Sequence, residues 1–382
     1  MTNATGAWLE QDATQALFAA FRGAGYELYC VGGCVRDALL GVPVSDIDMS
    51  TDATPEQILA LAKALKLRAV PTGIEHGTVT LLKNDIPFEI TTYRKDVETD
   101  GRRAVVAFAK TLEEDAQRRD LTMNALYCDA RGAITDPVGG IPDIAAQRVR
   151  FIGVAEERIK EDYLRILRFF RFYAWYGAPE GGIDADGLAA CAELADGIET
   201  LSAERIGAEM RKLLSAPDPS PAIAAMAQSG VLHRVMPGAE PGLLAVYVHF
   251  EAGRKPNWLG RVLALGGGDV TNFWRLTKAE ARSSMQMRSA LEKDVSVAEI
   301  AYRHGPENAW SVALVRSAAM QTTPDPQLGS EIENAAQATF PVGSADLMPK
   351  LQGAALGTEL KRLEASWIAS NFTLNKADLL GE

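Results

Sequence analysis

The sequence predicts an α+β protein with a small mixed sheet in its N-terminal third and a helical remainder. Strand-like and helix-like segments alternate up to about residue 145, and beyond it the strand signals fade while helical periodicity dominates. The chain has 382 residues, of which 47% are hydrophobic and 23% are charged. This is the composition of an ordinary globular protein with more than one domain, so a predominantly disordered chain is excluded.

The first elements follow one another closely. Residues 11–22 carry apolar side chains at helical spacing, and the strand-like YELYCV follows. The pair Gly32-Gly33 then predicts a turn into the short helix VRDALL, which Gly41 closes. The next segment, VSDIDMS, alternates like a strand.

A second helix and two more strands complete the predicted head. Thr54 is the expected N-cap of this helix, with Pro55 at its first position and Gln57 completing a capping box. Further along the chain, GTVTLL and IPFEITTY are predicted strands.

Helices are predicted for most of the remaining chain. One long helix is expected over 156–176 and another over 202–214, with Ser202 as its N-cap. The proline-rich run 215–222 is predicted to be a connector, and further breaks are expected at 266–268 and 323–326.

Charge and cysteine content set limits on function. With 39 basic and 50 acidic residues the net charge is −11, which disfavours nucleic-acid binding unless basic residues cluster locally. Residues 148–171 form such a cluster, since this segment contains seven Arg or Lys and four Asp or Glu, a net charge of +3. The four cysteines are too few and too irregularly spaced for a disulfide framework. Because no apolar run is long enough for a membrane span and the N-terminus lacks a signal peptide, we expect a cytoplasmic protein without a membrane partner.

Two aspartates carry the first chemical signal. Asp46 and Asp48 are two residues apart in a predicted strand, so their side chains share one face. Like charges this close repel unless a cation lies between them, and Mg²⁺ prefers carboxylates together with substrate phosphates. The alternative is a pair of solvated aspartates, which an isolated Asp-x-Asp would favour.

The preceding turn changes that balance. Gly32 and Gly33 follow a strand and begin a helix, so backbone N–H groups there can approach an anion. Arg36 lies one turn further on, where a guanidinium can bind the same phosphates. Together with the aspartates this predicts a site for a nucleoside triphosphate and a metal ion. Glu89, in the strand IPFEITT, is a candidate third carboxylate or a solvated glutamate.

The segment YCVGGCVRDALLGVPVSDIDMST resembles the signature of class II nucleotidyltransferases, the CCA-adding enzymes and bacterial poly(A) polymerases of the polymerase-beta-like superfamily. Four further segments resemble the later motifs of this family in the same order: RRDLTMNAL, DPVGGIPDI, EDYLRILRFFRF and LSAERIGAEMRKLL. The resemblance covers about residues 26–214. It implies a polymerase-beta-like head over 1–147, a helical neck over 148–214 that selects the base, and a helical body and tail over 215–382 that bind tRNA.

The resemblance also implies roles for individual residues. Asp46 and Asp48 would hold magnesium, with Glu89 as the third catalytic carboxylate. Nucleotide contacts would come from Gly32, Gly33, Arg36, Arg119 and Asp120. The alternative for residues 118–120 is a salt-bridge cluster at a helix start.

The fourth motif predicts how the base is chosen. Asp162 and Arg165 are three residues apart, so on one helix they would share a face and brace each other. An aspartate accepts hydrogen bonds and an arginine donates them, which matches the edges of cytosine and adenine and mismatches uracil and guanine. Arg168 and Arg171 continue the same row and would add phosphate contacts, whereas the apolar residues between them are expected in the core. The alternative is an ordinary ion pair within the helix.

Residues 91–110 resemble the flexible loop that helps CCA-adding enzymes to switch from CTP to ATP. The candidates in it are Arg94, Asp96, Arg102 and Arg103, and the alternative is a solvated loop. The loop has full length here, which disfavours an enzyme that adds only CC.

The sequence therefore predicts addition of CCA to tRNA 3′ ends from CTP and ATP, with Mg²⁺ as cofactor. The first alternative is a poly(A) polymerase, which uses the same chemistry with ATP alone. The second is a non-catalytic RNA-binding relative, which would be expected to lack one of the two aspartates.

Overall fold

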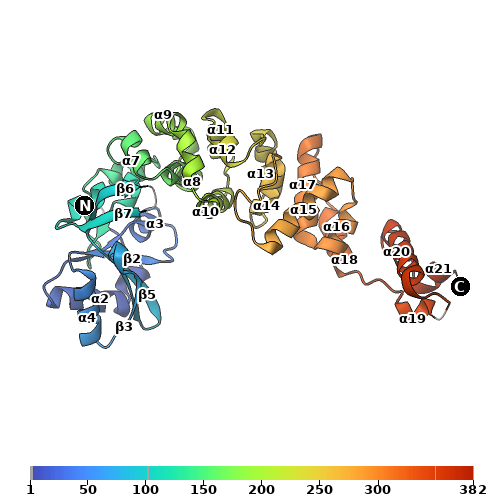
Figure 1. Cartoon of the computed structure of the whole chain (residues 1–382), viewed down its shortest axis with the longest axis horizontal. Helices are drawn as coiled ribbons and strands as arrows, with labels where there is room; N and C mark the ends of the chain where they lie inside the picture. The colour runs from blue at the N-terminus through green and yellow to red at the C-terminus, as the bar shows by residue number, and fades with distance from the viewer. Residues whose placement is uncertain (1–2, 101–102, 349, 382) are drawn as a thin grey trace. The chain divides into compact units, whose positions relative to one another are not determined.

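The computed structural model describes residues 3–100, 103–348 and 350–381, and it forms two compact units. Unit 1 contains Met1–Glu209 and Pro221–Val235, and unit 2 contains Met210–Ser220 and Met236–Glu382. Figure 1 shows strands in the N-terminal part of the chain and helices from α7 onward. The predicted α+β class is confirmed.

Unit 1 is built on a mixed sheet with the strand order β3-β4-β5-β2-β1-β8-β9. Strands β2 and β5 run parallel, and the other neighbouring pairs are antiparallel. The strands are β1 (Leu28–Val31), β2 (Ile47–Thr51), β3 (Arg68–Gly73), β4 (Thr78–Lys83), β5 (Ile86–Thr92), β8 (Tyr127–Cys128) and β9 (Ile134–Thr135). The four strands predicted here from alternation are confirmed as β1, β2, β4 and β5.

A second, two-stranded antiparallel sheet pairs β6 (Arg94–Asp100) with β7 (Arg103–Phe108). It occupies the segment that resembles the flexible loop. The backbone there is thus paired as strands, a pattern that its mixed charges had obscured.

The helices of unit 1 include those predicted in the head. Thr54 caps α4 with the expected box, since its hydroxyl accepts from the Gln57 N–H and the Gln57 side chain accepts from the Thr54 N–H. The bounds are α1 (Ala7–Glu10), α2 (Asp12–Gly23), α3 (Gly33–Leu39), α4 (Pro55–Ala64), α5 (Leu112–Gln117), α6 (Gly140–Ala145), α7 (Ala155–Glu161), α8 (Leu164–Tyr176), α9 (Ala185–Glu193), α11 (Ser220–Gln228) and α12 (Val231–Val235).

The single helix expected over 156–176 is wrong. Two helices occupy this segment, because Asp162 adopts an extended conformation (φ −159°, ψ 107°) between α7 and α8. The apolar positions of α8 are core, as predicted: Ile166, Leu167, Phe169 and Phe170 are fully buried.

Unit 2 is helical in the part that the structure describes. Helix α10 (Ala203–Leu214) crosses from unit 1 into unit 2. The remaining helices are α13 (Leu244–Glu251), α14 (Trp258–Leu265), α15 (Lys278–Glu292), α16 (Val297–His304), α17 (Pro306–Met320), α18 (Leu328–Gln337), α19 (Ser344–Leu347), α20 (Gly353–Ala369) and α21 (Lys376–Leu380). The breaks predicted at 266–268 and 323–326 fall between helices. Across the described residues, the helices are too short or too polar to cross a membrane.

Candidate active site

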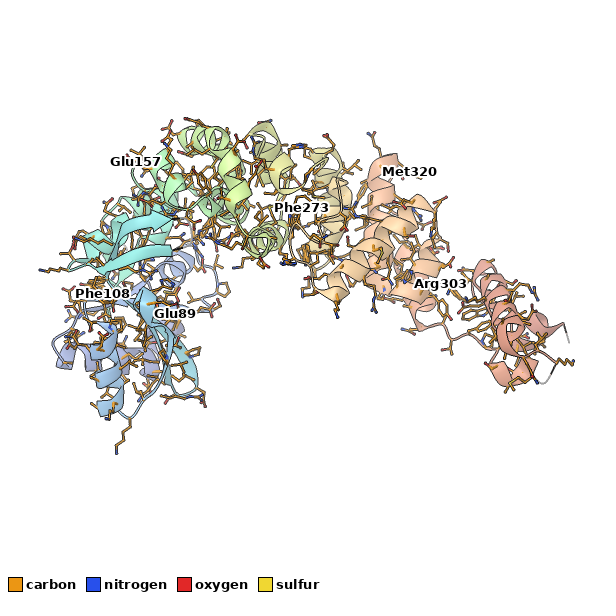
Figure 2. All side chains as sticks on the ribbon, viewed as in Figure 1. Glu89, Phe108, Glu157, Phe273, Arg303 and Met320 are labelled. Atoms are coloured by element: carbon orange, nitrogen blue, oxygen red, sulfur yellow. The ribbon has the colours of Figure 1, made fainter. Side chains whose placement is uncertain are left out.

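The carboxylates predicted from the sequence converge at neighbouring strands. Asp48 lies in β2 and is the register partner of Glu89 in β5, and Figure 2 labels Glu89. Because Asp48 and Glu89 are register partners, their side chains project from the same face of the sheet, on strands that are about 4.8 Å apart. Asp46 precedes β2 by one residue, and all three side chains are exposed. The sheet thus places Asp48 next to Glu89, and Asp46 lies just before the same strand.

This grouping is electrostatically unfavourable without a cation. The pKa of Asp48 is raised to about 6, because desolvation by the surrounding protein and repulsion from Glu89 and Asp46 outweigh the opposing effect of Arg119. Within the described ranges, no three His, Cys, Asp or Glu side chains lie close enough to enclose a metal by themselves. The donor set therefore fits a hard divalent ion that takes its remaining oxygen ligands from water or substrate phosphates.

The glycine turn lies beside this carboxylate group. Gly32 has a positive φ of 76° and is the N-cap residue of α3, and as a glycine it has no side chain to bond the first N–H groups of the helix. A Cβ at Gly32 would lie 3.5 Å from Nη1 of Arg119, so the Arg119 guanidinium is next to the turn. A guanidinium next to a helix N-terminus and within electrostatic reach of Asp48 suits the binding of a polyphosphate.

Arg36 has protein partners in this structure. Its Nε donates to Asp37 (2.9 Å), Nη1 donates to Asn124 (2.7 Å) and Nη2 donates to the Tyr176 hydroxyl (2.7 Å). The guanidinium also lies over the Tyr176 ring at 4.1 Å. A phosphate contact by Arg36 therefore requires that it exchange some of these partners.

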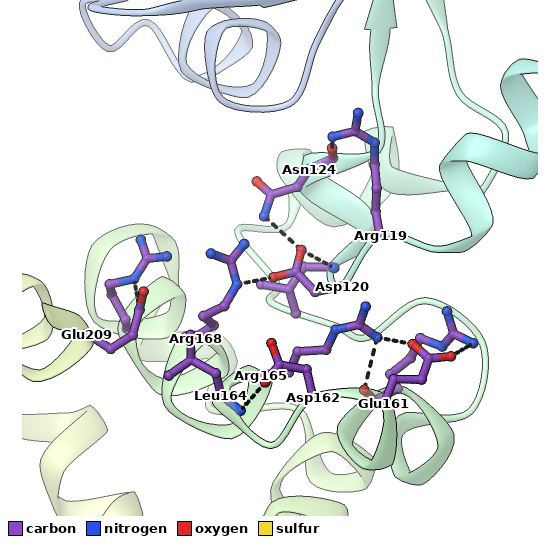
Figure 3. A network of polar contacts seen from close by, with 12 residues as sticks. Arg119, Asp120, Asn124, Glu161, Asp162, Leu164, Arg165, Arg168 and Glu209 are labelled. Atoms are coloured by element: carbon purple, nitrogen blue, oxygen red, sulfur yellow. Dashed lines mark hydrogen bonds and ion pairs between the residues drawn. The ribbon is translucent and has the colours of Figure 1, made fainter. Parts of the chain in front are cut away.

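Asp120 is the centre of a buried polar network (Figure 3). One oxygen accepts from the Leu121 N–H (2.9 Å) and from Asn124 (3.4 Å), and the other accepts from Nε of Arg168 (2.6 Å). The salt-bridge alternative for residues 118–120 thus describes real ion pairs, although they lie after α5 and not at a helix start.

The predicted brace between Asp162 and Arg165 is wrong. The break between α7 and α8 separates the two side chains, so each has another partner. Asp162 accepts from Nη2 of Arg205 (2.6 Å), and Arg165 pairs with Glu161 and donates to the Arg118 carbonyl (3.0 Å). Figure 3 shows both side chains near the Asp120–Arg168 pair.

The basic cluster of residues 148–171 is largely neutralised within unit 1. Arg171 pairs with the buried Glu209 (2.5 Å), and Phe172 lies beneath its guanidinium at 4.3 Å. Arg148 and Arg150 both pair with the buried Asp143. Several of the arginines that give this segment its net charge of +3 are therefore paired with acidic residues elsewhere in unit 1.

The residues of the loop-like segment lie partly outside the described residues. Arg94 begins β6, and its side chain donates to the His76 carbonyl. Arg102 lies outside the described residues, as do the side chains of Asp96 and Arg103. Their roles stay predictions.

The Asp120 network predicts a specific pH dependence of stability. Burial raises the pKa of Asp120, but Arg168 lowers it further, so the pKa lies well below its usual range. Because the folded pKa is depressed, the stabilisation is complete above the unfolded pKa of about 3.9 and is lost as the pH falls below it. We expect Asp120→Asn to lower the free energy of unfolding by about 3 kcal/mol at pH 7. Thermal unfolding at pH 7, 5, 4 and 3 should show this difference shrinking at the acidic end.

The matched control for this measurement is Glu157→Gln. Glu157 is exposed on α7, so the same loss of one charge should change stability by only a few tenths of a kcal/mol. An Asp120→Asn difference that stayed constant with pH would contradict the ion-pair assignment.

Several residues of the site were not singled out from the sequence: Asp115, Asn124, Tyr127, Glu161, Arg205 and Glu209. Asp115 and Glu161 had a visible signal, because each precedes an arginine by three or four residues. Arg205 and Glu209 contact the fourth motif from a distant helix, and helical spacing does not reveal such partners.

Two protein-family models match the chain. The model described as the poly A polymerase head domain matches residues 28–150. The model described as the probable RNA and SrmB-binding site of polymerase A matches residues 182–243.

The chain is also similar to individual proteins that are named as CCA-adding enzymes or CCA tRNA nucleotidyltransferases. The chain is 38% identical over 275 residues to a CCA-adding enzyme of Streptococcus sanguinis, which covers 69% of the chain and 67% of that protein. It is 45% identical over 190 residues to the human mitochondrial CCA tRNA nucleotidyltransferase 1, covering 50% of the chain and 44% of the relative, so this match spans less than half of the human protein. The structure is similar to that of a Bacillus stearothermophilus CCA-adding enzyme in complex with CTP, with a TM-score of 0.75, 27% identity and coverage of 94% and 92% of the two chains.

Proposed function

Because the chain belongs to the family of CCA-adding enzymes, we propose that it adds C, C and A to tRNA 3′ ends, using CTP and ATP and releasing pyrophosphate. The observation that carries this proposal is the registered pair Asp48 and Glu89 on parallel strands, with Arg119 beside the glycine turn. In the reaction, the terminal hydroxyl of the tRNA attacks the α-phosphate. A new O–P bond forms as the bond to pyrophosphate breaks.

The proposed metal site consists of Asp46 and Asp48, with Glu89 as the third carboxylate. The family implies a divalent metal, for which we propose Mg²⁺; when bound, it lowers the pKa of the attacking hydroxyl and neutralises charge on the phosphates. The oxygen-only donor set and the repulsion at Asp48 support this assignment.

The nucleotide site extends from the glycine turn toward α8. We place the triphosphate and ribose against a set of groups on the turn, after α5 and on α8: Gly32, Gly33, Arg36, Arg119, Asp120, Arg168 and Arg171. The hydrogen bonds from Arg168 to Asp120, from Asn124 to Asp120 and from Arg36 to Asn124 join these groups in one network within unit 1, which supports a single nucleotide site. Arg94, Asp96, Arg102 and Arg103 would act in the change from CTP to ATP.

Base choice is assigned to Asp162 and Arg165. The carboxylate of Asp162 would accept the exocyclic amino group of cytosine or adenine, and the Arg165 guanidinium would donate to the adjacent ring nitrogen. Arg205 and Glu161 hold these two side chains in place of the mutual brace.

The helical region 215–382 is proposed to bind tRNA, following a head over 1–147 and a neck over 148–214. The match of residues 182–243 to an RNA-binding model supports an RNA partner. Recognition of RNA by shape and backbone fits a helical surface. The four cysteines are free and buried, which supports the proposed reducing, cytoplasmic compartment.

The test uses purified protein, Mg²⁺, CTP and ATP with three tRNA transcripts that end at the discriminator base, at C or at CC. The expected products gain three, two and one nucleotides respectively, and extension then stops. A long A-tail would replace this proposal with poly(A) synthesis. Absence of incorporation with every acceptor would overturn both and favour an RNA-binding relative.

A further inference from the structure

One buried carboxylate in unit 1 has no role in the reaction just proposed. Asp115 lies in α5 and is fully buried, and its oxygens accept hydrogen bonds from several elements of the head. Nε of Arg118 donates to one oxygen (2.8 Å), while Nη2 of Arg119 (3.2 Å) and the Tyr127 hydroxyl (2.7 Å) donate to the other.

Two further hydrogen-bond donors connect Asp115 to β2, the strand that contains Asp48, and to the β6–β7 sheet. The hydroxyl of Ser50, two residues after Asp48 in β2, donates to Asp115 at 3.2 Å. The backbone N–H of Arg94, where β6 begins, donates at 3.4 Å. The Asp115 side chain thus contacts β2, the β6–β7 sheet and the two arginines that follow α5.

The charge on Asp115 is retained because of these partners. Burial raises the pKa of Asp115, but Arg119, Arg118 and the Tyr127 hydroxyl lower it further, so its pKa lies well below the usual range. A buried and ionised carboxylate holds its guanidinium partners firmly, because loss of either partner would leave a buried charge without compensation.

Arg119 is the partner that reaches the proposed nucleotide site. Its guanidinium lies beside Gly32, and it acts electrostatically on Asp48. Asp115 binds the same guanidinium through Nη2, and Tyr127 accepts from its Nε (3.2 Å). Asp115 therefore bonds Nη2 of Arg119 while Nη1 lies by the glycine turn, and this bond holds the guanidinium in position.

We propose that Asp115 is a positioning residue that fixes the Arg119 guanidinium for the phosphates and ribose of the incoming nucleotide. The proposal rests on the function proposed above. We expect the effect of changing Asp115 to be the same for CTP and ATP, since Arg119 lies by the glycine turn whereas recognition of the base is assigned to Asp162 and Arg165.

The test compares the KM and kcat of Asp115→Asn with those of the wild type. We expect the KM for CTP and for ATP to rise by the same factor, about tenfold or more, with a smaller effect on kcat and unchanged discrimination against UTP. Glu114→Gln is the matched control, because Glu114 immediately precedes Asp115 and its carboxylate accepts from the Lys110 backbone N–H and pairs with Lys95 instead of the arginines. It should leave both KM values unchanged.

Asp115→Glu keeps the charge and provides a second variant if Asp115→Asn does not fold, as judged by circular dichroism and thermal unfolding. It displaces the carboxylate by one methylene, so the KM for both nucleotides should again rise together. Unchanged KM with a lower kcat in a folded variant would overturn the proposal. If the wild type incorporates no nucleotide, calorimetric binding of CTP and ATP to the same variants still tests Asp115 separately from the proposed function, and equal affinities would overturn it.

Discussion

Replacing Asp48 with Asn is expected to lower the rate of nucleotide incorporation by about a thousandfold or more while the protein remains folded. Asp48 is the carboxylate whose register partner is Glu89, and Asp46 lies two residues before it, just ahead of β2. At the proposed metal site this change would leave Asp46 and Glu89 as the carboxylates for a divalent ion that takes its other oxygen ligands from water and substrate phosphates. Single-turnover extension of a tRNA that ends in CC measures the effect directly.

The metal-free stability of this variant provides an independent check. Because Glu89 and Asp46 repel Asp48, loss of this charge should leave the melting temperature of the metal-free protein unchanged or higher. In the wild type, a chelator should reproduce the loss of activity, and added Mg²⁺ should restore it. The Asn variant should recover little activity at any Mg²⁺ concentration.

Asp85→Asn is a suitable control for the Asp48 variant. Asp85 is exposed in the turn between β4 and β5, where its positive φ of 61° is a conformation that Asn tolerates. The same chemical change outside the site should leave incorporation within about twofold of the wild type. Comparable loss in both variants would show that the acidic group at β2 and β5 is not the metal site.

Much of the head could be predicted because its signals are local. The alternation around Asp46 and Asp48 predicted β2, and the box of Thr54 and Gln57 predicted the start of α4. Each signal depends on residues within a few positions of one another, where spacing determines which side chains share a face. The register that places Glu89 next to Asp48 is not local, because it depends on which strands become neighbours.

The fourth motif shows where spacing is insufficient. Asp162 and Arg165 have the spacing of an intrahelical pair, but so do Glu161 and Arg165, and the second pair forms. The break at Asp162 frees its carboxylate for Arg205, which lies on α10 about forty residues further along the chain. Tertiary contacts therefore decided between two local patterns of similar strength.

The structure also changes the interpretation of the basic cluster. Counted along the sequence, residues 148–171 carry an excess of positive charge, but Arg168 and Arg171 are paired with Asp120 and Glu209, which lie outside that range. A sequence count includes only the acids within its window. At the proposed nucleotide site, attraction for phosphates would require guanidinium groups such as Arg168 and Arg171 to exchange these partners.

Replacing Asp162 with Ala is expected to reduce the preference for CTP over UTP, measured as the ratio of kcat/KM values, by about a hundredfold. The carboxylate would accept from the amino group of cytosine, and uracil offers a carbonyl oxygen there that leaves both groups unsatisfied. Each mismatched buried polar group costs about 1–3 kcal/mol, and two of them account for this factor. Asp162→Asn should go further, because its amide can rotate to donate to the uracil oxygen and so raise incorporation of UTP itself.

Because Arg205, and not Arg165, bonds Asp162, a variant of Arg205 should show an intermediate loss of base preference. Arg205→Lys keeps a charge near the carboxylate but not the guanidinium geometry that now bonds it at 2.6 Å, so its loss of base preference should be smaller than that of Asp162→Ala. Asp186→Asn, at an exposed position of α9, is the control and should keep the wild-type ratio. Equal preference for CTP in Asp162→Ala and in Asp186→Asn would remove Asp162 from base selection, because a carboxylate that contacts the base cannot be deleted without altering the ratio.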